Sequence, residues 1–220
     1  MIDVSFRISG VKVPSDHGYS LYSTLSRLLP NLHEAEWLSI HPINGFPAGD
    51  RTLRLSTEAR LQLRLPPERL PFVLPLAGKR IVLSANGSEF RISLGIPEVF
   101  ELRPASVLHS RCVIIKLSES TKNKTHPDKE TFVASAQTQL RERGINGEIS
   151  IDDRRNERGH DLARRVIHIK DQIIVGYAMR VAGLGDEDSL KLQERGLGGK
   201  HRMGCGVFVP VGPLALRQSR

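Results

Sequence analysis

The chain has 220 residues, 39% of them hydrophobic and 25% charged, a composition typical of globular proteins that excludes a wholly disordered, collagen-like or coiled-coil chain. Its length allows one large domain or two domains of about 100 residues each. The 32 lysines and arginines outnumber the 24 acidic residues and leave a net charge of +8, which indicates a nucleic-acid partner or simply a soluble basic protein, and favours an anionic membrane surface less.

Alternating apolar residues from Ile2 to Ile8 predict a first strand with one buried face. Leucines then recur at helical spacing over residues 21–32, and Pro30 ends or distorts that helix, which places His33 at or just past its C-terminal end. The other elements expected in the first half are a short strand at 37–43, a strand pattern at 52–65, a helix at 67–77, and strands at 79–83 and 90–94.

Residues 97–104 have the prolines of a linker, and a second run of elements follows. The elements expected there are a strand at 111–117, a polar insertion at 118–130, a helix at 132–143, strands at 145–151, 166–170 and 173–181, a helix at 186–195, and a last strand at 206–210. The order β-α-β-β-α-β therefore occurs twice. It predicts an α+β fold of two tandem ferredoxin-like domains, at residues 1–96 and 105–220.

Several classes of site are absent from the sequence. Cys112 and Cys205 have no partner at the CxxC spacing of a zinc site, and P-loop, HExxH and GxSxG motifs do not occur. The longest apolar run, at 70–77, is interrupted by prolines and is too short to span a membrane. Because the first ten residues also lack the apolar core of a signal peptide, we expect a cytoplasmic protein with reduced cysteines. Because the motifs named above are missing, we expect no cofactor or metal ion.

A glycine-rich loop at residues 196–206 lies between the last predicted helix and the last predicted strand. Its glycines permit tight turns and a close approach of the backbone to a ligand, and Lys200, His201 and Arg202 add positive charge. Exposed N–H groups among cations suit a phosphate backbone, so the loop is a candidate nucleic-acid contact. The order helix, loop, strand is the reverse of a dinucleotide-binding motif, so the loop is not of that type. The alternative is a purely structural loop.

With its flanking residues this loop reads SLKLQERGLGGKHRMGCGVFVP, which resembles the C-terminal segment of the CRISPR repeat-processing endoribonucleases in the RAMP superfamily. Residues 21–43, LYSTLSRLLPNLHEAEWLSIHPI, are similar to the first helix and second strand of a branch found in some type I systems. The chain length and the doubled element order agree with the same family. The resemblance thus spans essentially the whole chain and implies tandem ferredoxin-like domains of the RAMP type.

This resemblance implies an activity. Members of the family bind the repeat of a precursor CRISPR RNA and cut it once, without a metal ion, to give mature guide RNA. The 2′-hydroxyl attacks the adjacent phosphate and leaves a 2′,3′-cyclic phosphate, which requires a base, an acid and cations near the phosphate. The implied partners are CRISPR repeat RNA, as precursor and as mature guide, and other subunits of the CRISPR effector complex, with no membrane.

The resemblance also places the family's catalytic histidine at His33. His41 is the second candidate and His17 the third. Tyr22 and Tyr19 are candidates because some members use a tyrosine beside the histidine. Each has a structural alternative, because a histidine at a helix end interacts favourably with the helix dipole and a half-buried tyrosine is a common core residue.

Two segments and one further arginine are candidates for RNA binding. The residues are Gly196, Gly198, Gly199, Lys200, His201 and Arg202 in the glycine-rich loop, Arg154, Arg155 and Arg158 in the Arg-rich segment 152–165, and Arg27 in the first helix. The resemblance implies that the Arg-rich segment is the hairpin that contacts the repeat stem in relatives, and Arg side chains bind phosphates and guanine edges. Because the segment also carries carboxylates, a solvated hairpin tip is the alternative.

Two other functions remain open from the sequence. The first is a RAMP subunit that holds guide RNA in an effector complex without cutting it, for which His33 has no catalytic role. The second is an unrelated ferredoxin-like protein with no RNA partner, which would not bind a repeat hairpin.

Overall fold

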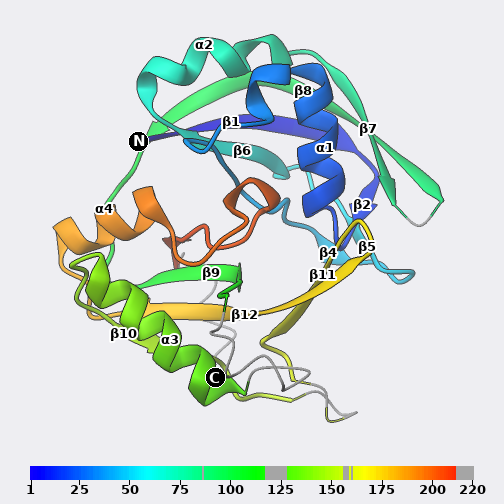
Figure 1. The fold of residues 1–220 in the computed structure, drawn as a ribbon. Coiled ribbons are helices and arrows are strands. Elements are labelled where there is room, and N and C mark those ends of the chain that lie inside the picture. Colours follow the sequence, from blue (N-terminus) through cyan, green and yellow to red (C-terminus); the bar gives the residue numbers. More distant parts are fainter. Residues whose placement is uncertain (86, 117–127, 156–158, 160, 212–220) are drawn as a thin grey trace. The chain divides into compact units, whose positions relative to one another are not determined.

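The structure is a computed structural model that describes residues 1–85, 87–116, 128–155, 159 and 161–211. The chain divides into two compact units (Figure 1). Unit 1 contains residues 1–102, 168–172 and 201–204, and unit 2 contains residues 103–167, 173–200 and 205–220. Two short segments of unit 1 therefore come from the second half of the sequence.

The main sheet of unit 1 has five strands in the order β3-β6-β1-β8-β7, and each neighbouring pair is antiparallel. The strands are β1 (Ile2–Gly10), β3 (Ser39–Ile40), β6 (Arg60–Leu65), β7 (Arg80–Ala85) and β8 (Ser88–Glu101). The first and third strands of the motif, β1 and β6, lie in the middle, and the second and fourth, β3 and β8, flank them. This is the ferredoxin-like arrangement that the sequence predicts.

A second, three-stranded sheet of unit 1 has the order β2-β5-β4, with β2 (Lys12–Pro14), β4 (Phe46–Pro47) and β5 (Thr52–Arg54). The strand pattern predicted at 52–65 thus belongs to two strands of different sheets. A turn separates them, in which the N–H of Ala59 donates to the carbonyl of Ser56 over 3.1 Å.

Helix α1 (Gly18–Leu28) packs on unit 1 through Leu21 and Leu25, which are 1% and 0% exposed. The hydroxyl of Thr24 donates to the carbonyl of Val82 and so ties the helix to β7. The helix is shorter than predicted because Pro30 begins a separate 3-10 turn, η1 (Pro30–Leu32). Proline is tolerated as the first residue of such a turn, because the N–H at that position has no hydrogen-bond partner within the turn.

The helix predicted at 67–77 is three short turns: η2 (Pro67–Arg69), α2 (Leu70–Val73) and η3 (Leu74–Leu76). Pro71 and Pro75 cannot donate backbone hydrogen bonds, so a continuous helix cannot form there. Val73 and Leu76 are both 0% exposed and hold these turns against the core of unit 1.

The predicted linker at 97–104 is wrong for its first five residues. Strand β8 continues through Pro97 to Glu101 and pairs with β1 along the whole of that stretch. Pro97 stands opposite Phe6, beside a shift in strand register between Phe6 and Ile8, and such irregularities are where a strand tolerates proline.

Unit 2 repeats the same topology, with sheet order β10-β12-β9-β13 and β11 added beside β12. Its elements are β9 (Leu108–Val113), α3 (Lys129–Glu142), β10 (Glu148–Ser150), β11 (Arg164–Ile169), β12 (Gln172–Ala182), α4 (Asp186–Arg195) and β13 (Val209–Pro210). The 3-10 turn η5 (His201–Met203) belongs to unit 1. The prediction of two ferredoxin-like motifs is therefore confirmed, with β11 as an extra strand.

Three predicted strands are shorter in the structure: 37–43 reduces to β3, 145–151 to β10, and 206–210 to β13. Each lies at the edge of its sheet and pairs with only two or three residues of a longer neighbouring strand. The strand predicted at 111–117 is β9, which begins and ends earlier than predicted. The helix predicted at 132–143 is α3, which begins at Lys129 because Asp128 is its N-cap and accepts a hydrogen bond from the N–H of Thr131.

The core of unit 2 forms between α3 and the sheet. Phe132, Ala136 and Leu140, spaced four residues apart, are 0% exposed, and the Phe132 ring meets Tyr177 of β12 edge-on at 4.9 Å. Cys112 is a buried residue of β9, and no disulfide joins it to Cys205. No helix in the described part of the chain combines the length and the apolar character needed to cross a membrane.

Candidate functional site

His33 lies just past the end of α1 and η1, where the sequence places it. Leu32 is 1% exposed and anchors the turn in the core of unit 1, whereas the side chain of His33 is exposed. The turn therefore holds the backbone of His33 in place and leaves its imidazole accessible to a ligand.

Tyr22 supports the backbone of His33 from within the core. Its side chain is 9% exposed, and its hydroxyl donates to the carbonyl oxygen of His33 over 2.8 Å. The two rings lie 6.3 Å apart, with an angle of 20° between their planes. The phenolic proton of Tyr22 is thus used in a hydrogen bond that orients His33.

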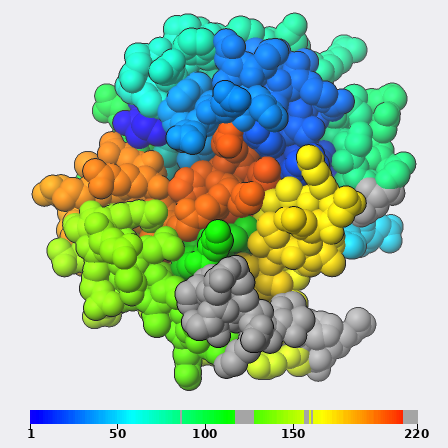
Figure 2. Space-filling view, in the orientation of Figure 1, coloured from blue at the N-terminus to red at the C-terminus, as the bar shows by residue number. Residues whose placement is uncertain are grey.

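Arg202 joins the same group of residues from the distant end of the sequence. Its guanidinium donates to the carbonyl oxygen of His33 and lies 5.3 Å from the centre of the Tyr22 ring. Turn η5, which carries Arg202, packs on α1, and Figure 2 shows these orange-red residues against the blue surface of the first 40 residues. Within unit 1, the structure thus brings together Tyr22, His33 and Arg202 from the predicted set.

Gly18, the first residue of α1, makes this packing possible. A Cβ atom at Gly18 would lie 2.3 Å from the backbone carbonyl oxygen of Met203, closer than any side chain tolerates. Only glycine therefore allows η5 to approach the start of α1 as closely as it does.

The other predicted catalytic residues lie elsewhere in unit 1. Tyr19 lines a separate pocket together with Asp16 and His168. His17 is 3% exposed, and its imidazole bonds to the carbonyl of Pro14 and accepts from the N–H of Ile43. His17 therefore links the start of α1 to the segment after β3, which is a structural role.

His41 is 5% exposed and bonds to Asp3 through its Nε2 atom. Arg64, which is 1% exposed, makes a two-pronged ion pair with the same carboxylate, at 2.8 Å from Nε and 2.9 Å from Nη2. Burial alone would raise the pKa of Asp3, but the hydrogen bonds from Arg64 and His41 outweigh it and hold that pKa far below its ordinary value. Burial lowers the pKa of His41, so this histidine is neutral near pH 7.

The described part of the glycine-rich loop in unit 2 uses its backbone for internal contacts. The N–H of Gly198 donates to the Gln139 side chain and that of Gly199 to the carbonyl of Ile114. Arg143 donates to the carbonyl of Gly196 over 2.9 Å. The expectation that the N–H groups of Gly198 and Gly199 are exposed for phosphate is therefore wrong; the positive charge of Lys200 remains at the surface.

A pocket of about 450 Å³ in unit 2 adjoins this loop. Three positively charged residues line it, namely Lys116, Arg143 and Lys200, and they outnumber the one carboxylate in its wall, that of Glu142. Lys116 and Arg143 were missed by sequence reasoning, because each lies in an unrelated segment and carries no motif. This pocket is the candidate phosphate contact of unit 2.

Gly198→Ala is expected to destabilise unit 2 by about 2 kcal/mol or more. Gly198 has a φ of +73°, and a Cβ atom there would lie 2.1 Å from the carbonyl oxygen of Ile114, while the left-handed backbone alone costs about 1–2 kcal/mol for a residue other than glycine. Urea unfolding measures the difference. Gly199→Ala is the matched control, because no atom lies within 4 Å of its added methyl group; equal stability of the two variants would contradict the prediction.

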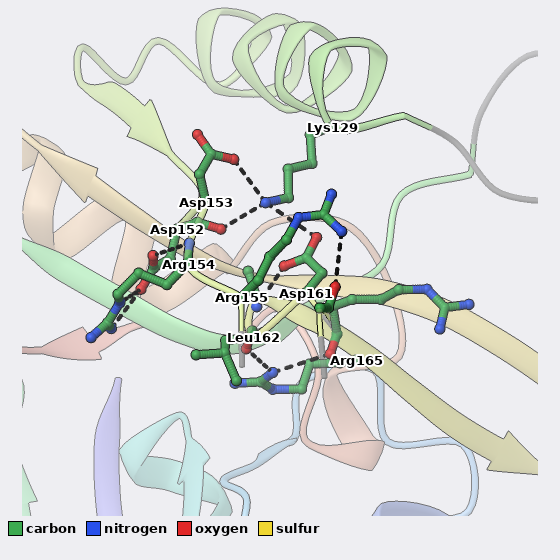
Figure 3. Close-up of polar contacts among 11 residues, drawn as sticks. Lys129, Asp152, Asp153, Arg154, Arg155, Asp161, Leu162 and Arg165 are labelled. Atoms are coloured by element: carbon green, nitrogen blue, oxygen red, sulfur yellow. Dashed lines mark hydrogen bonds and ion pairs between the residues drawn. The ribbon is translucent and has the colours of Figure 1, made fainter. Parts of the chain in front are cut away.

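The Arg-rich segment is held together by internal ion pairs, as Figure 3 shows. Lys129 of α3 bonds to Asp153 at 2.8 Å and to Asp161 at 3.1 Å. Arg154 pairs with the carboxylate of Asp152, and Arg155 donates to the carbonyl of Gly159. Two of the three arginines predicted to bind RNA therefore already have partners within the segment. Arg158 lies outside the described residues.

Arg27 is an exposed residue in the last turn of α1, and its guanidinium donates to the hydroxyl of Thr24 over 3.3 Å. His201, the remaining predicted residue, is part of η5 and is half-buried. In the described part of the chain, no group of three or more His, Cys, Asp or Glu side chains is arranged to hold a metal ion.

Sequence reasoning also missed the pair Asp16 and His168. The carboxylate of Asp16 accepts from the backbone N–H of His168 over 2.7 Å and lies 2.8 Å from its imidazole Nδ1 atom. These residues are 152 positions apart, and no local pattern relates them. The contact fixes the tip of the β11–β12 hairpin as part of unit 1.

Comparison with known proteins extends these observations. A model of the Cas6 Crispr family matches residues 2–212. The CRISPR-associated endonuclease Cas6 of Myxococcus xanthus is 33% identical over 218 residues, which cover 99% of this chain and 85% of that protein.

Solved structures share the fold at low sequence identity. A structure described as CRISPR associated protein Cas6 superposes with a TM-score of 0.69 at 14% identity, covering 96% of this chain and 98% of that one. A structure described as a RAMP protein binding different RNA substrates superposes with a TM-score of 0.65 at 13% identity, covering 96% of this chain and 100% of that one. Thermus thermophilus Cse3 bound to an RNA representing a pre-cleavage complex superposes with a TM-score of 0.52 at 14% identity, covering 96% of this chain and 98% of that one. The resemblance noted in the sequence is confirmed, and this chain belongs to the Cas6 Crispr family.

Proposed function

We propose that this protein is a metal-independent endoribonuclease that binds CRISPR repeat RNA and cleaves it to mature guide RNA. The observation that carries the proposal is the exposed imidazole of His33, whose backbone is fixed by Tyr22 and Arg202. Family membership, the endonuclease name of the Myxococcus relative and the RNA-bound state of Cse3 support it. The two predicted domains, 1–96 and 105–220, remain part of this proposal.

In the proposed reaction, the 2′-hydroxyl oxygen beside the cut loses its proton and bonds to the adjacent phosphorus atom. The bond from phosphorus to the 5′-oxygen breaks, and that oxygen takes up a proton. The products are a 2′,3′-cyclic phosphate and a 5′-hydroxyl. His33 transfers one of these protons, because imidazole is the side chain best suited to acid–base work near pH 7.

The other candidate residues have separate roles. Arg202 brings positive charge to the reacting phosphate, where charge develops in the transition state, and Tyr22 is a positioning residue. Tyr19 and His41 remain alternatives to be tested by substitution. The glycine-rich loop, through Lys200 and His201, together with Arg27 and the Arg-rich segment, is assigned to binding the RNA backbone.

The test is to incubate the protein with a repeat hairpin RNA in EDTA and to identify the product ends. We expect a single cut with a 2′,3′-cyclic phosphate, and no cut when the nucleotide at that site is 2′-deoxy, because the attacking hydroxyl is then missing. Cleavage that stops on chelation would contradict the metal-independent mechanism. Tight binding without cleavage would identify a guide-holding subunit, and no binding would identify a protein without an RNA role.

A further inference from the structure

A pocket of about 540 Å³ in unit 1 has His33 in its wall. The residues that line it are Pro30, Asn31, His33, Glu34, Trp37, Arg69 and Phe72. They come from η1 and the segment after it, and from the three short turns at 67–76. The pocket is within the size range of small-molecule sites and is large enough for a nucleobase.

One wall of this pocket is a cluster of two aromatic rings and an arginine. The Trp37 and Phe72 rings lie 6.2 Å apart, and the guanidinium carbon of Arg69 lies 5.5 Å from the centre of the Trp37 ring and 5.6 Å from that of Phe72. Attraction of the guanidinium to both rings favours this position of Arg69 beside the pocket.

This cluster is at the surface rather than in the core. Phe72 is 37% exposed, whereas Val73 and Leu76 on the same turns are 0% exposed and make the core contacts. Arg69 is also exposed. An aromatic side chain and an arginine that are exposed beside a candidate catalytic histidine form a surface on which a planar ligand can stack.

The planes of the Trp37 and Phe72 rings are inclined at 48°, so a planar base can stack on only one of them. We propose that this pocket binds one unpaired base of the RNA, next to the bond that is cut, by stacking it on the exposed ring of Phe72 beside the guanidinium of Arg69. This inference rests on the proposed function. Unpaired RNA bases stack on aromatic rings and on arginine planes. The carboxylate of Glu34 in the pocket wall disfavours a phosphate there and favours a base edge that donates hydrogen bonds. Binding the base would place its own phosphate beside His33.

The test combines an abasic substrate with a protein variant. A base-free nucleotide is placed, one position at a time, on either side of the cut, and single-turnover cleavage and RNA affinity are measured. At one position the wild-type protein should lose about 5- to 100-fold in affinity or rate, the loss typical of one stacked base. Phe72→Ala should show a similar loss on intact RNA and little further loss on that abasic RNA.

Two variants serve as controls. Phe72→Ala removes a side chain that is 37% exposed, so thermal unfolding should show that it folds normally. Leu74→Ala removes an exposed apolar residue of the neighbouring turn η3, which is 43% exposed and does not line the pocket, and should behave as the wild type on every substrate.

If Phe72 contacts the missing base, combining Phe72→Ala with the abasic RNA should cost little more than either change alone. If the two losses instead multiply at every abasic position, the two changes are independent and the inference is overturned. The same holds if no abasic position affects the wild-type protein. Intact RNA that the wild-type protein neither binds nor cuts would instead contradict the proposed function itself, so the two failures can be told apart.

Discussion

Replacing His33 with alanine is expected to slow single-turnover cleavage of repeat RNA by about 10²- to 10⁴-fold, the usual contribution of one placed proton-transfer group. RNA affinity should change little, because the imidazole is exposed and is assigned to the chemical step. The backbone contacts from Tyr22 and Arg202 go to the carbonyl oxygen of His33 and survive the substitution.

Three measurements separate this role from a structural one. Thermal unfolding of His33→Ala should match the wild type, because the side chain is exposed. Added imidazole should restore part of the rate, since it supplies the missing group. Lys200→Ala, in the other unit, should weaken binding and flatten its salt dependence while the rate at saturating protein stays the same.

Arg202 is expected to contribute in two ways, by positioning His33 and by bringing positive charge to the reacting phosphate. Arg202→Ala removes both its hydrogen bond to the His33 carbonyl and its contact with the Tyr22 ring, and a displaced catalytic group costs up to about 10²-fold. The loss should appear in kcat more than in KM. Normal cleavage by His33→Ala would contradict the assignment and transfer it to Tyr19 or His41.

The largest loss of stability is expected from Arg64→Met. Breaking a buried ion pair by removing one partner typically costs about 3–5 kcal/mol, because the other charge is left buried without compensation. Arg64 is 1% exposed and makes two hydrogen bonds to Asp3. Urea unfolding of the wild type and the variant at pH 7 measures this difference.

The pH dependence gives a second signature of the same pair. Because Arg64 and His41 depress the pKa of Asp3 against the effect of burial, the stabilisation is complete above about pH 4, near the ordinary pKa of an aspartate, and is lost as the pH falls further. The gap between the wild type and Arg64→Met should therefore shrink in acid. A gap that stays constant from pH 7 to pH 3 would contradict this account.

Arg60→Met is the matched control on the same strand. Arg60 pairs with Glu58 at 3.4 Å, and the Glu58 side chain is 77% exposed. Exposed ion pairs contribute about 0–1 kcal/mol, so this variant should remain close to the wild type at every pH.

Local patterns in the sequence predicted the elements in which buried residues recur at the regular spacing of a strand or a helix. The alternation in β1 and the spacing of Leu21 and Leu25 in α1 report which faces are buried, and the bounds predicted for α4 agree with the structure. The proline that ends α1 also located His33 correctly. The helix predicted at 67–77 is wrong as a continuous helix, because Pro71 and Pro75 cannot supply the backbone donors that a helix needs.

The amino-acid sequence by itself thus determined the doubled ferredoxin-like order, the family resemblance and the position of His33, since each depends on neighbouring residues or on a contiguous motif. Only the tertiary structure decided which distant residues surround His33. Arg202 reaches its carbonyl across 169 positions, Arg69 and Phe72 come from turns that follow another strand, and Asp16 meets His168 across 152 positions. Such contacts arise when strand pairing and core packing bring separate segments together, and hydrophobic periodicity records only which side of each segment is buried, not which other segment it meets.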